Sequence, residues 1–160
     1  VRGRSRRSLV NATGGAGSPR ENALVPDWSP PASDPRWAEM KSVVEKYAFS
    51  DDRIDVADPG VQTTWIAYSV FAKVVRAMDE GTRVTSTSVE KAFDHTTALS
   101  TGGLTPELGW TDTDLLDLPD HSRLGDAQVT YQVVRNGQLV QQSGGFVDVT
   151  HTLREATGAL

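Results

Sequence analysis

The 160-residue chain lacks cysteine, which excludes disulfides, thiolate nucleophiles and cysteine-ligated metals. Aromatic residues make up only 7% of the chain and hydrophobic residues 38%, so the core that it can form is small. Long hydrophobic runs are also lacking: the most apolar stretch, residues 61–78, is interrupted by Lys73 and Arg76 among other polar residues. The length and composition therefore predict one globular domain with an attached tail.

Positive charge is scarce except at the beginning of the chain. The net charge is -5, which argues against general affinity for nucleic acid. Residues 1–20 nevertheless contain arginines and no acidic residue, and glycine, serine and proline are frequent up to residue 33. We interpret residues 1–33 as a basic tail and linker. No apolar signal core follows the arginines, so this chain, expressed as it stands, is expected to remain in the cytoplasm.

Apolar periodicity predicts three helices. The first begins near Asp34, a good N-cap followed by a proline, and its expected core side comprises Trp37, Met40, Val43, Val44 and Tyr47. The second, over residues 61–78, has a wide apolar arc that predicts burial and the centre of the core, along a stripe of Trp65, Tyr68, Phe71, Ala72, Val75 and Met78. The third is short, over residues 85–93, where Thr87 and Glu90 have the spacing of a capping box.

Beyond residue 100 the pattern favours β-structure. Residues 101–110 carry turn residues and Pro106, which is compatible with an edge strand. Residues 127–134 alternate between apolar and polar, and Asn136-Gly137 then predicts a two-residue type I′ hairpin turn. That turn places Val133 opposite Val140 and Arg135 opposite Gln138. The last ten residues are expected to be a frayed end.

The sequence contains no recognisable catalytic or metal-binding constellation. His95, His121 and His151 have no metal-ligand spacing, and the acidic loop after residue 111 does not follow the calcium-loop pattern. The glycines of residues 14–17 lack the Lys-Ser/Thr that a phosphate-binding loop requires. We therefore expect no enzyme activity, no metal and no cofactor.

The order of these segments resembles a known family over residues 24–147. The motifs that carry the resemblance are the apolar helix at 63–75, Thr-Gly-Gly-Leu-Thr-Pro at 101–106, and Tyr-Gln-Val-Val-Arg-Asn-Gly-Gln-Leu-Val at 131–140. They resemble the C-terminal portion of type I periplasmic-binding-fold substrate-binding proteins of ABC transporters, in the branched-chain amino acid family. The resemblance implies an α/β fold: a partial type I periplasmic-binding fold, with three helices followed by a C-terminal strand and β-hairpin. Residues 34–150 would form this portion, and residues 151–160 the frayed end.

The resemblance also implies a function. Such a protein closes around a small solute and delivers it to a membrane permease on the extracellular or periplasmic side. Here Gln62 and Trp65 would face the ligand, and Gly102 and Gly103 would form a hinge. With Gln62 at this position, a polar solute, such as an amino acid or a related acid or amide, is as good a candidate as an aliphatic amino acid. The first lobe of the family has no counterpart in this sequence, so we expect a fragment that lacks its N-terminal lobe and binds solute weakly alone.

An alternative from a different functional class is a stand-alone α+β protein-interaction domain without ligand binding. The apolar arc of residues 61–78 is too wide for a single layer of helices to cover. Its exposed side would then drive self-association.

Overall fold

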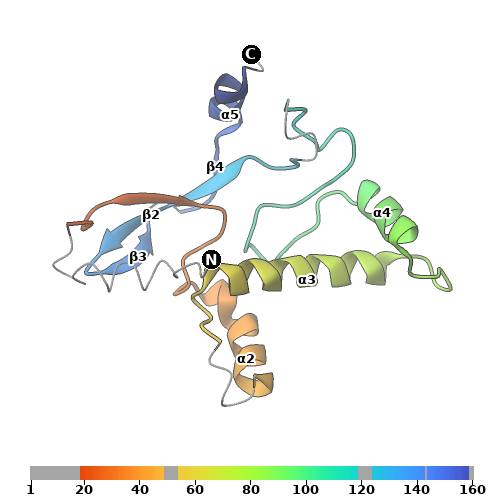
Figure 1. The fold of residues 1–160 in the computed structure, drawn as a ribbon, viewed down its shortest axis with the longest axis horizontal. Coiled ribbons are helices and arrows are strands. Elements are labelled where there is room, and N and C mark those ends of the chain that lie inside the picture. The colour runs from red at the N-terminus through yellow and green to blue at the C-terminus, as the bar shows by residue number, and fades with distance from the viewer. Residues whose placement is uncertain (1–18, 49–53, 119–123, 143, 159–160) are drawn as a thin grey trace. The chain divides into compact units, whose positions relative to one another are not determined.

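The computed structural model describes residues 19–48, 54–118, 124–142 and 144–158. Over these residues the chain is a mixed α/β protein with four α-helices, a short 3-10 helix and a small antiparallel sheet (Figure 1). It divides into two compact units: unit 1 comprises residues 1–65 and 130–146, and unit 2 comprises residues 66–129 and 147–160. Helix α3 and strand β2 each continue from one unit into the other.

The sheet of unit 1 is built around β2 (Gln128–Arg135). Strand β1 (Leu24–Asp27) pairs with one edge of β2 and β3 (Gln138–Gln141) with the other, both antiparallel. Val133 lies opposite Val140 and Arg135 opposite Gln138, which confirms the predicted register. Asn136 and Gly137 have φ values of 50° and 73°, the left-handed conformation that a type I′ turn requires at both positions.

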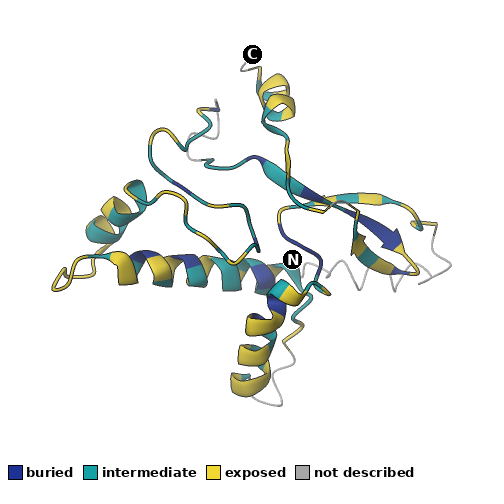
Figure 2. Cartoon of the chain, turned by 180° about the vertical axis from the view of Figure 1, so that it is seen from behind, coloured by how far each residue is buried: buried dark blue, intermediate teal, exposed yellow. Residues whose placement is uncertain are grey.

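The helical part of unit 1 begins as the sequence predicts. The side chain of Asp34 accepts a hydrogen bond from the backbone N–H of Arg36, and Pro35–Trp37 form the 3-10 helix η2 that leads into α2 (Ala38–Tyr47). Trp37 and Met40 are buried, but Val43 and Tyr47 are exposed (Figure 2). The predicted apolar stripe is therefore right only for its first part, because only the first turn of α2 packs against the core.

Asp34 gives unit 1 a testable dependence on pH. Its carboxylate accepts hydrogen bonds from Arg36 Nε at 2.8 Å and Nη2 at 2.7 Å, and this pairing holds the pKa of Asp34 below its usual value. A carboxyl group with a lowered folded-state pKa stabilises the fold above the unfolded-state pKa and loses that contribution as the pH falls through the folded-state pKa. We expect Asp34→Ala to lower the free energy of unfolding by about 1 kcal/mol at pH 7.

The difference between Asp34→Ala and the wild type should shrink as the pH is lowered below the unfolded-state pKa of about 4. Urea unfolding at pH 7 and at low pH measures it. Asp34→Asn is the control, since it keeps the capping oxygen and removes the charge. A stability difference between the alanine variant and the wild type that does not change with pH would contradict this role of the Arg36 pair.

Helix α3 (Pro59–Ala77) enters unit 2 at Ile66 and is followed there by α4 (Ser86–Asp94). The capping box of α4 lies two residues before the predicted one. Thr85 Oγ1 accepts from the backbone N–H of Ser88 at 3.2 Å, and Ser88 Oγ accepts from the N–H of Thr85 at 2.9 Å. The pairing of Thr87 with Glu90 is therefore wrong, because Thr85 has the extended backbone of an N-cap while Thr87 is already inside the helix.

The predicted edge strand over residues 101–110 is also wrong. The structure has only an isolated bridge there, in which Leu99 and Leu108 exchange backbone hydrogen bonds of 2.8 and 3.0 Å. Gly102 and Gly103 have φ values of 72° and 81°, and two successive left-handed residues turn the chain back on itself. The Thr101 hydroxyl accepts from the backbone N–H of Thr105 at 2.8 Å and holds the turn closed.

The apolar side chains that unit 2 buries come from α3 and from the long loop after α4. They are Val70, Val74, Leu104, Leu118 and Ala127. On α3 the buried residues are Val70 and Val74, which lie beside the predicted stripe. Tyr68 and Phe71 belong to that stripe but are 71% and 43% exposed. Phe93 of α4 contacts Trp110 of the loop edge to face, with ring centroids 5.0 Å apart.

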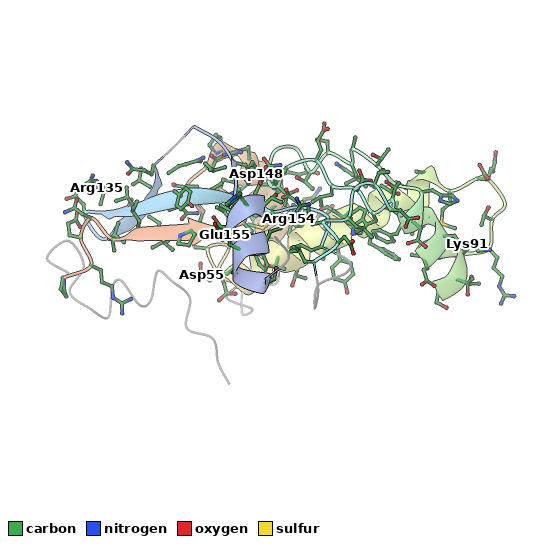
Figure 3. The ribbon with its side chains drawn as sticks, turned by 90° about the horizontal axis from the view of Figure 1, so that it is seen from above. Asp55, Lys91, Arg135, Asp148, Arg154 and Glu155 are labelled. Carbon is green, nitrogen blue, oxygen red and sulfur yellow. The ribbon has the colours of Figure 1, made fainter. Side chains whose placement is uncertain are left out.

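Regular structure also occurs where the sequence analysis expects a linker and a frayed end. Strand β1 lies within residues 1–33, and helix α5 (Thr150–Thr157) lies within residues 151–160 apart from its first residue. Before α5, strand β4 (Val147–Asp148) pairs with the start of β2. Helix α5 exposes Arg154 and Glu155 (Figure 3) and ends at Gly158 in the left-handed conformation.

Of the helices in the described residues, none combines the length and apolar character needed to cross a membrane. Most of the basic tail, including the arginines of residues 2–7, and His121 lie outside the described residues.

Candidate functional site

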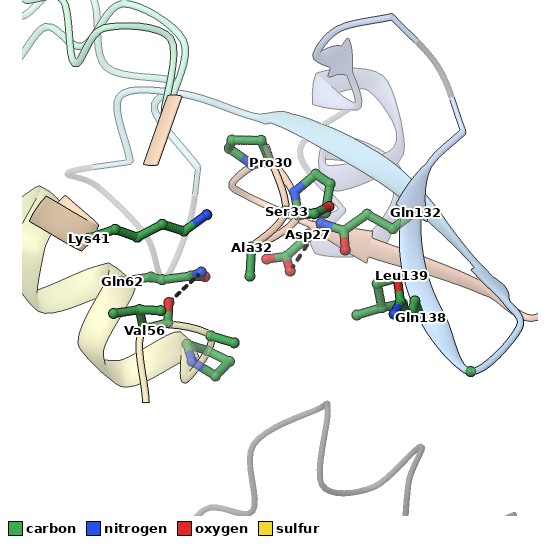
Figure 4. A pocket seen from close by; sticks show the side chains of 14 residues that line it. Asp27, Pro30, Ala32, Ser33, Lys41, Val56, Gln62, Gln132, Gln138 and Leu139 are labelled. Carbon is green, nitrogen blue, oxygen red and sulfur yellow. Dashed lines mark hydrogen bonds between the residues drawn. The ribbon is translucent and has the colours of Figure 1, made fainter. Parts of the chain in front are cut away.

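Unit 1 contains a pocket of about 320 Å³ (Figure 4). This volume lies near the lower end of the range for small-molecule sites, about 300–1,000 Å³. The described residues that line it come from four places in unit 1: the segment after β1, the first turn of α2, the start of α3 and the β2–β3 hairpin. Residues far apart in the sequence therefore meet around one space.

The segment after β1 is held in place by buried polar side chains of β2. Thr130 Oγ1 donates to the backbone oxygen of Ser29 at 2.9 Å, and Gln132 Nε2 donates to the same oxygen at 3.1 Å. Trp37 Nε1 donates to the backbone oxygen of Pro30 at 3.2 Å. The prolines that follow Ser29 restrict the backbone, so these hydrogen bonds suffice to fix one wall of the pocket.

Gln62, which the resemblance implies as a ligand-binding residue, lines this pocket. Asp58 Oδ1 accepts from the backbone N–H of Gly60 at 2.8 Å and so caps the start of α3, one turn before Gln62. The side chain of Gln62 is buried, and its Nε2 donates to the backbone oxygen of Val56 at 3.1 Å. Within the described residues no hydrogen bond reaches its Oε1, which leaves this acceptor for a ligand or water.

Gln132 and Asp27 form a second polar group in the wall. Asp27 Oδ1 accepts from the backbone N–H of Trp28 at 2.8 Å, and its Oδ2 accepts from Gln132 Nε2 at 3.5 Å. Gln132 is only 1% exposed, yet no described residue donates to its Oε1. The sequence analysis missed both residues. The sequence offers no local signal for them, since Gln132 stands between Tyr131 and Val133 at an ordinary polar position of the alternating strand.

Lys41 projects toward the pocket from α2 (Figure 4). Its side chain is half-buried, and none of the described residues forms a hydrogen bond or an ion pair with its ammonium group. The pocket thus gathers one ammonium, one carboxylate and two buried amides from segments that only the tertiary fold brings together. Such an arrangement can hold a small polar molecule by charge and hydrogen bonds.

The other candidate residues lie elsewhere. Trp65, one turn beyond Gln62 on α3, is half-buried and is absent from the described lining of the pocket. Gly102 and Gly103 belong to unit 2, where they form the turn described above. Their role as a hinge and the contact of Trp65 with a ligand stay predictions.

Comparisons with protein families, with curated proteins and with solved structures find no match to this chain.

Proposed function

We propose that this chain is a solute-binding component of an ABC-type importer, or a C-terminal part of one, with a partial type I periplasmic-binding fold. The proposal is supported by the motifs over residues 24–147 and by the mixed α/β architecture. In this proposal the chain works outside the cytoplasmic membrane and delivers a small solute, such as an amino acid or a related acid or amide, to a permease. An N-terminal lobe would complete the receptor.

The observation that carries the proposal is the pocket around Gln62. Gln62 and Gln132 are 6% and 1% exposed, and their Oε1 atoms receive no hydrogen bond from the described residues. Two amide acceptors that no described residue engages, beside one pocket, can accept hydrogen bonds from a polar molecule that fills it.

The proposal is tested by calorimetry and thermal unfolding of the full 160-residue chain with a panel of amino acids, related acids and amides. We expect binding weaker than micromolar, with stabilisation that grows as the ligand concentration exceeds Kd. Gln62→Leu should abolish the stabilisation because it removes the polar groups and keeps most of the volume. Trp65→Ala tests whether Trp65 also contacts the solute.

Gln142→Leu is the matched control, since Gln142 is exposed and is not among the described lining residues. If no solute of the panel stabilised the chain, the proposed function would be wrong. If solutes bound equally well to Gln62→Leu, the site would lie elsewhere.

A second candidate function is a protein-interaction domain, favoured by apolar exposure in unit 1. Leu24 and Val140 flank the buried Val133 on one face of the sheet and are 63% and 44% exposed. Trp28, just after β1, is 58% exposed. This candidate requires self-association that rises with concentration, which analytical ultracentrifugation measures. If the protein stayed monomeric at all concentrations, this candidate function would be contradicted.

A further inference from the structure

We propose that the pocket of unit 1 selects an uncharged solute with two separated hydrogen-bond donors, such as a diol or a diamide. One end of the solute donates to Gln62 Oε1 and the other end to Gln132 Oε1. The inference rests on the proposed function, because it assumes that this pocket is the solute site. It goes further in naming the hydrogen-bonding class of the solute and the two oxygens that select it.

The fold determines which way each of the two glutamine amides points. Gln62 Nε2 donates to the backbone oxygen of Val56 at 3.1 Å. Gln132 Nε2 donates to the backbone oxygen of Ser29, also at 3.1 Å. A carbonyl oxygen can only accept, so turning either amide over would bring two acceptors together and lose the hydrogen bond. Both amides are therefore held with Nε2 toward the backbone, and their Oε1 atoms are left to accept from elsewhere.

The same two oxygens keep access to open space. Of the fully buried side-chain nitrogen and oxygen atoms in the described residues, only Glu21 Oε2 has no hydrogen-bond partner. No described residue donates to Gln62 Oε1 or Gln132 Oε1, yet neither oxygen belongs to that fully buried class. Because both side chains line the pocket, its space is where a donor can reach them.

The charged groups beside the pocket are engaged by the protein itself. Asp27 and Lys41 are the only charged residues among the described lining residues. The carboxylate of Asp27 accepts hydrogen bonds from the next backbone N–H and from Gln132 Nε2. The pKa of Asp34 is lowered mainly by its hydrogen bond from Arg36 and further by the charge of Lys41, so Lys41 interacts with Asp34. A charged solute would lose hydration and find both of these charges already engaged, which favours an uncharged solute.

The separation of the two oxygens determines the form of the solute. Gln62 and Gln132 lie on opposite sides of the pocket (Figure 4). A solute that meets both must carry donors at two separated positions. The chain between the donors would cross a space lined in part by apolar side chains such as Val56 and Leu139. A short aliphatic diol or diamide has this form, whereas ethers and carboxylates have no donor.

A pair of isomers gives the sharpest test. Butane-1,4-diol and 1,2-dimethoxyethane have the same composition and no charge, but only the diol has donors. Butanediamide and butanedioate form a second pair of similar size, in which only the diamide donates. NMR titrations of the full chain, followed through the amide signals of the pocket residues, measure the Kd of each compound. We expect the donor-bearing member of each pair to bind roughly tenfold to hundredfold more tightly.

Two variants identify the contacts, since methionine keeps the length of a glutamine side chain and removes its amide. Gln62→Met and Gln132→Met should each lower the preference for the diol over its isomer roughly threefold to tenfold. Gln142→Met is the matched control and should keep the full preference, because Gln142 is exposed and is not among the described lining residues. Thermal unfolding without solute confirms that each variant is folded. If Gln132→Met fails to fold, Gln62→Met and the two pairs of compounds decide the question.

The outcomes separate this inference from the proposed function. Equal or tighter binding of the ether or of butanedioate, or an unchanged preference in Gln62→Met, would overturn the inference while a solute-binding function stands. The same holds if an amino acid binds and none of these four compounds does. Failure of every solute, these four and the wider panel alike, would overturn the proposed function and the inference together.

Discussion

Replacing Trp37 by alanine is expected to lower the free energy of unfolding of unit 1 by about 3–5 kcal/mol. The indole is completely buried beside Met40, so the substitution removes a large apolar volume and leaves a cavity. It also removes the hydrogen bond from Nε1 to the backbone oxygen of Pro30. That oxygen belongs to the pocket wall, so the solute binding proposed above should weaken along with stability.

Trp28→Ala provides the matched control, because Trp28 is 58% exposed. Its backbone hydrogen bond to Asp27 survives the substitution, and the change in stability should stay within about 0.5 kcal/mol. Urea unfolding with hydrogen exchange resolved by residue measures both variants. Protection should fall in α2 and β2 of Trp37→Ala. Equal losses in the two variants would show that Trp37 is not the centre of this core.

Gly125→Ala should destabilise unit 2 by about 1–3 kcal/mol. A Cβ atom at Gly125 would lie 2.5 Å from the backbone oxygen of Gly109, and a backbone atom cannot move aside as a flexible side chain can. Gly109 is itself confined, since a Cβ atom there would lie 2.3 Å from Asp114 Oδ2. This carboxylate is engaged by the hydroxyl of Thr111 at 2.6 Å. The two loop segments are thus packed as closely as their backbones permit.

Gly144→Ala is the control for this prediction. No atom lies within 4 Å of a Cβ built there and the φ of Gly144 is not in the left-handed range, so the substitution should be neutral or slightly stabilising. Thermal unfolding and hydrogen exchange over residues 104–127 measure the effect of each variant. If Gly125→Ala proved as stable as Gly144→Ala, the close approach of Gly125 to Gly109 would not be required by the fold.

The features that the sequence predicts correctly depend on residues close together in the chain. Asp34 and Pro35 define the start of η2, and Asn136-Gly137 defines the turn and register of the hairpin. Both follow from backbone preferences that act within a few residues. The predictions of the α4 capping box and of the edge strand were wrong, although they too rest on residues close together in the chain. Thr85, not Thr87, is the N-cap of α4. Two successive left-handed glycines make a turn where the edge strand was expected.

What could not be predicted depends on partners distant in the sequence. Strand β1 lies in the segment that the sequence predicts to be a linker, because its apolar residues form no pattern without β2 beside them. The pocket has the same origin: only the resemblance to a family implies Gln62 as a site residue, and Lys41, Asp27 and Gln132 have no local motif. Gln132 even fits the polar position of an alternating strand, and only packing shows that it is buried.

The antiparallel pairing of β1 with β2 has a consequence for how the protein is made. The hydrogen bond between Ser29 and Gln132 can form only after the ribosome has added Gln132, which is 103 residues later in the chain. At the usual speed of translation this wait lasts about 5–20 s. During it the nascent segment carrying Trp37 and Met40 has been made without β2, whose Thr130 and Gln132 hold the nearby backbone of Ser29. Chaperones that hold apolar nascent chains should therefore engage this segment and release it once the hairpin has emerged.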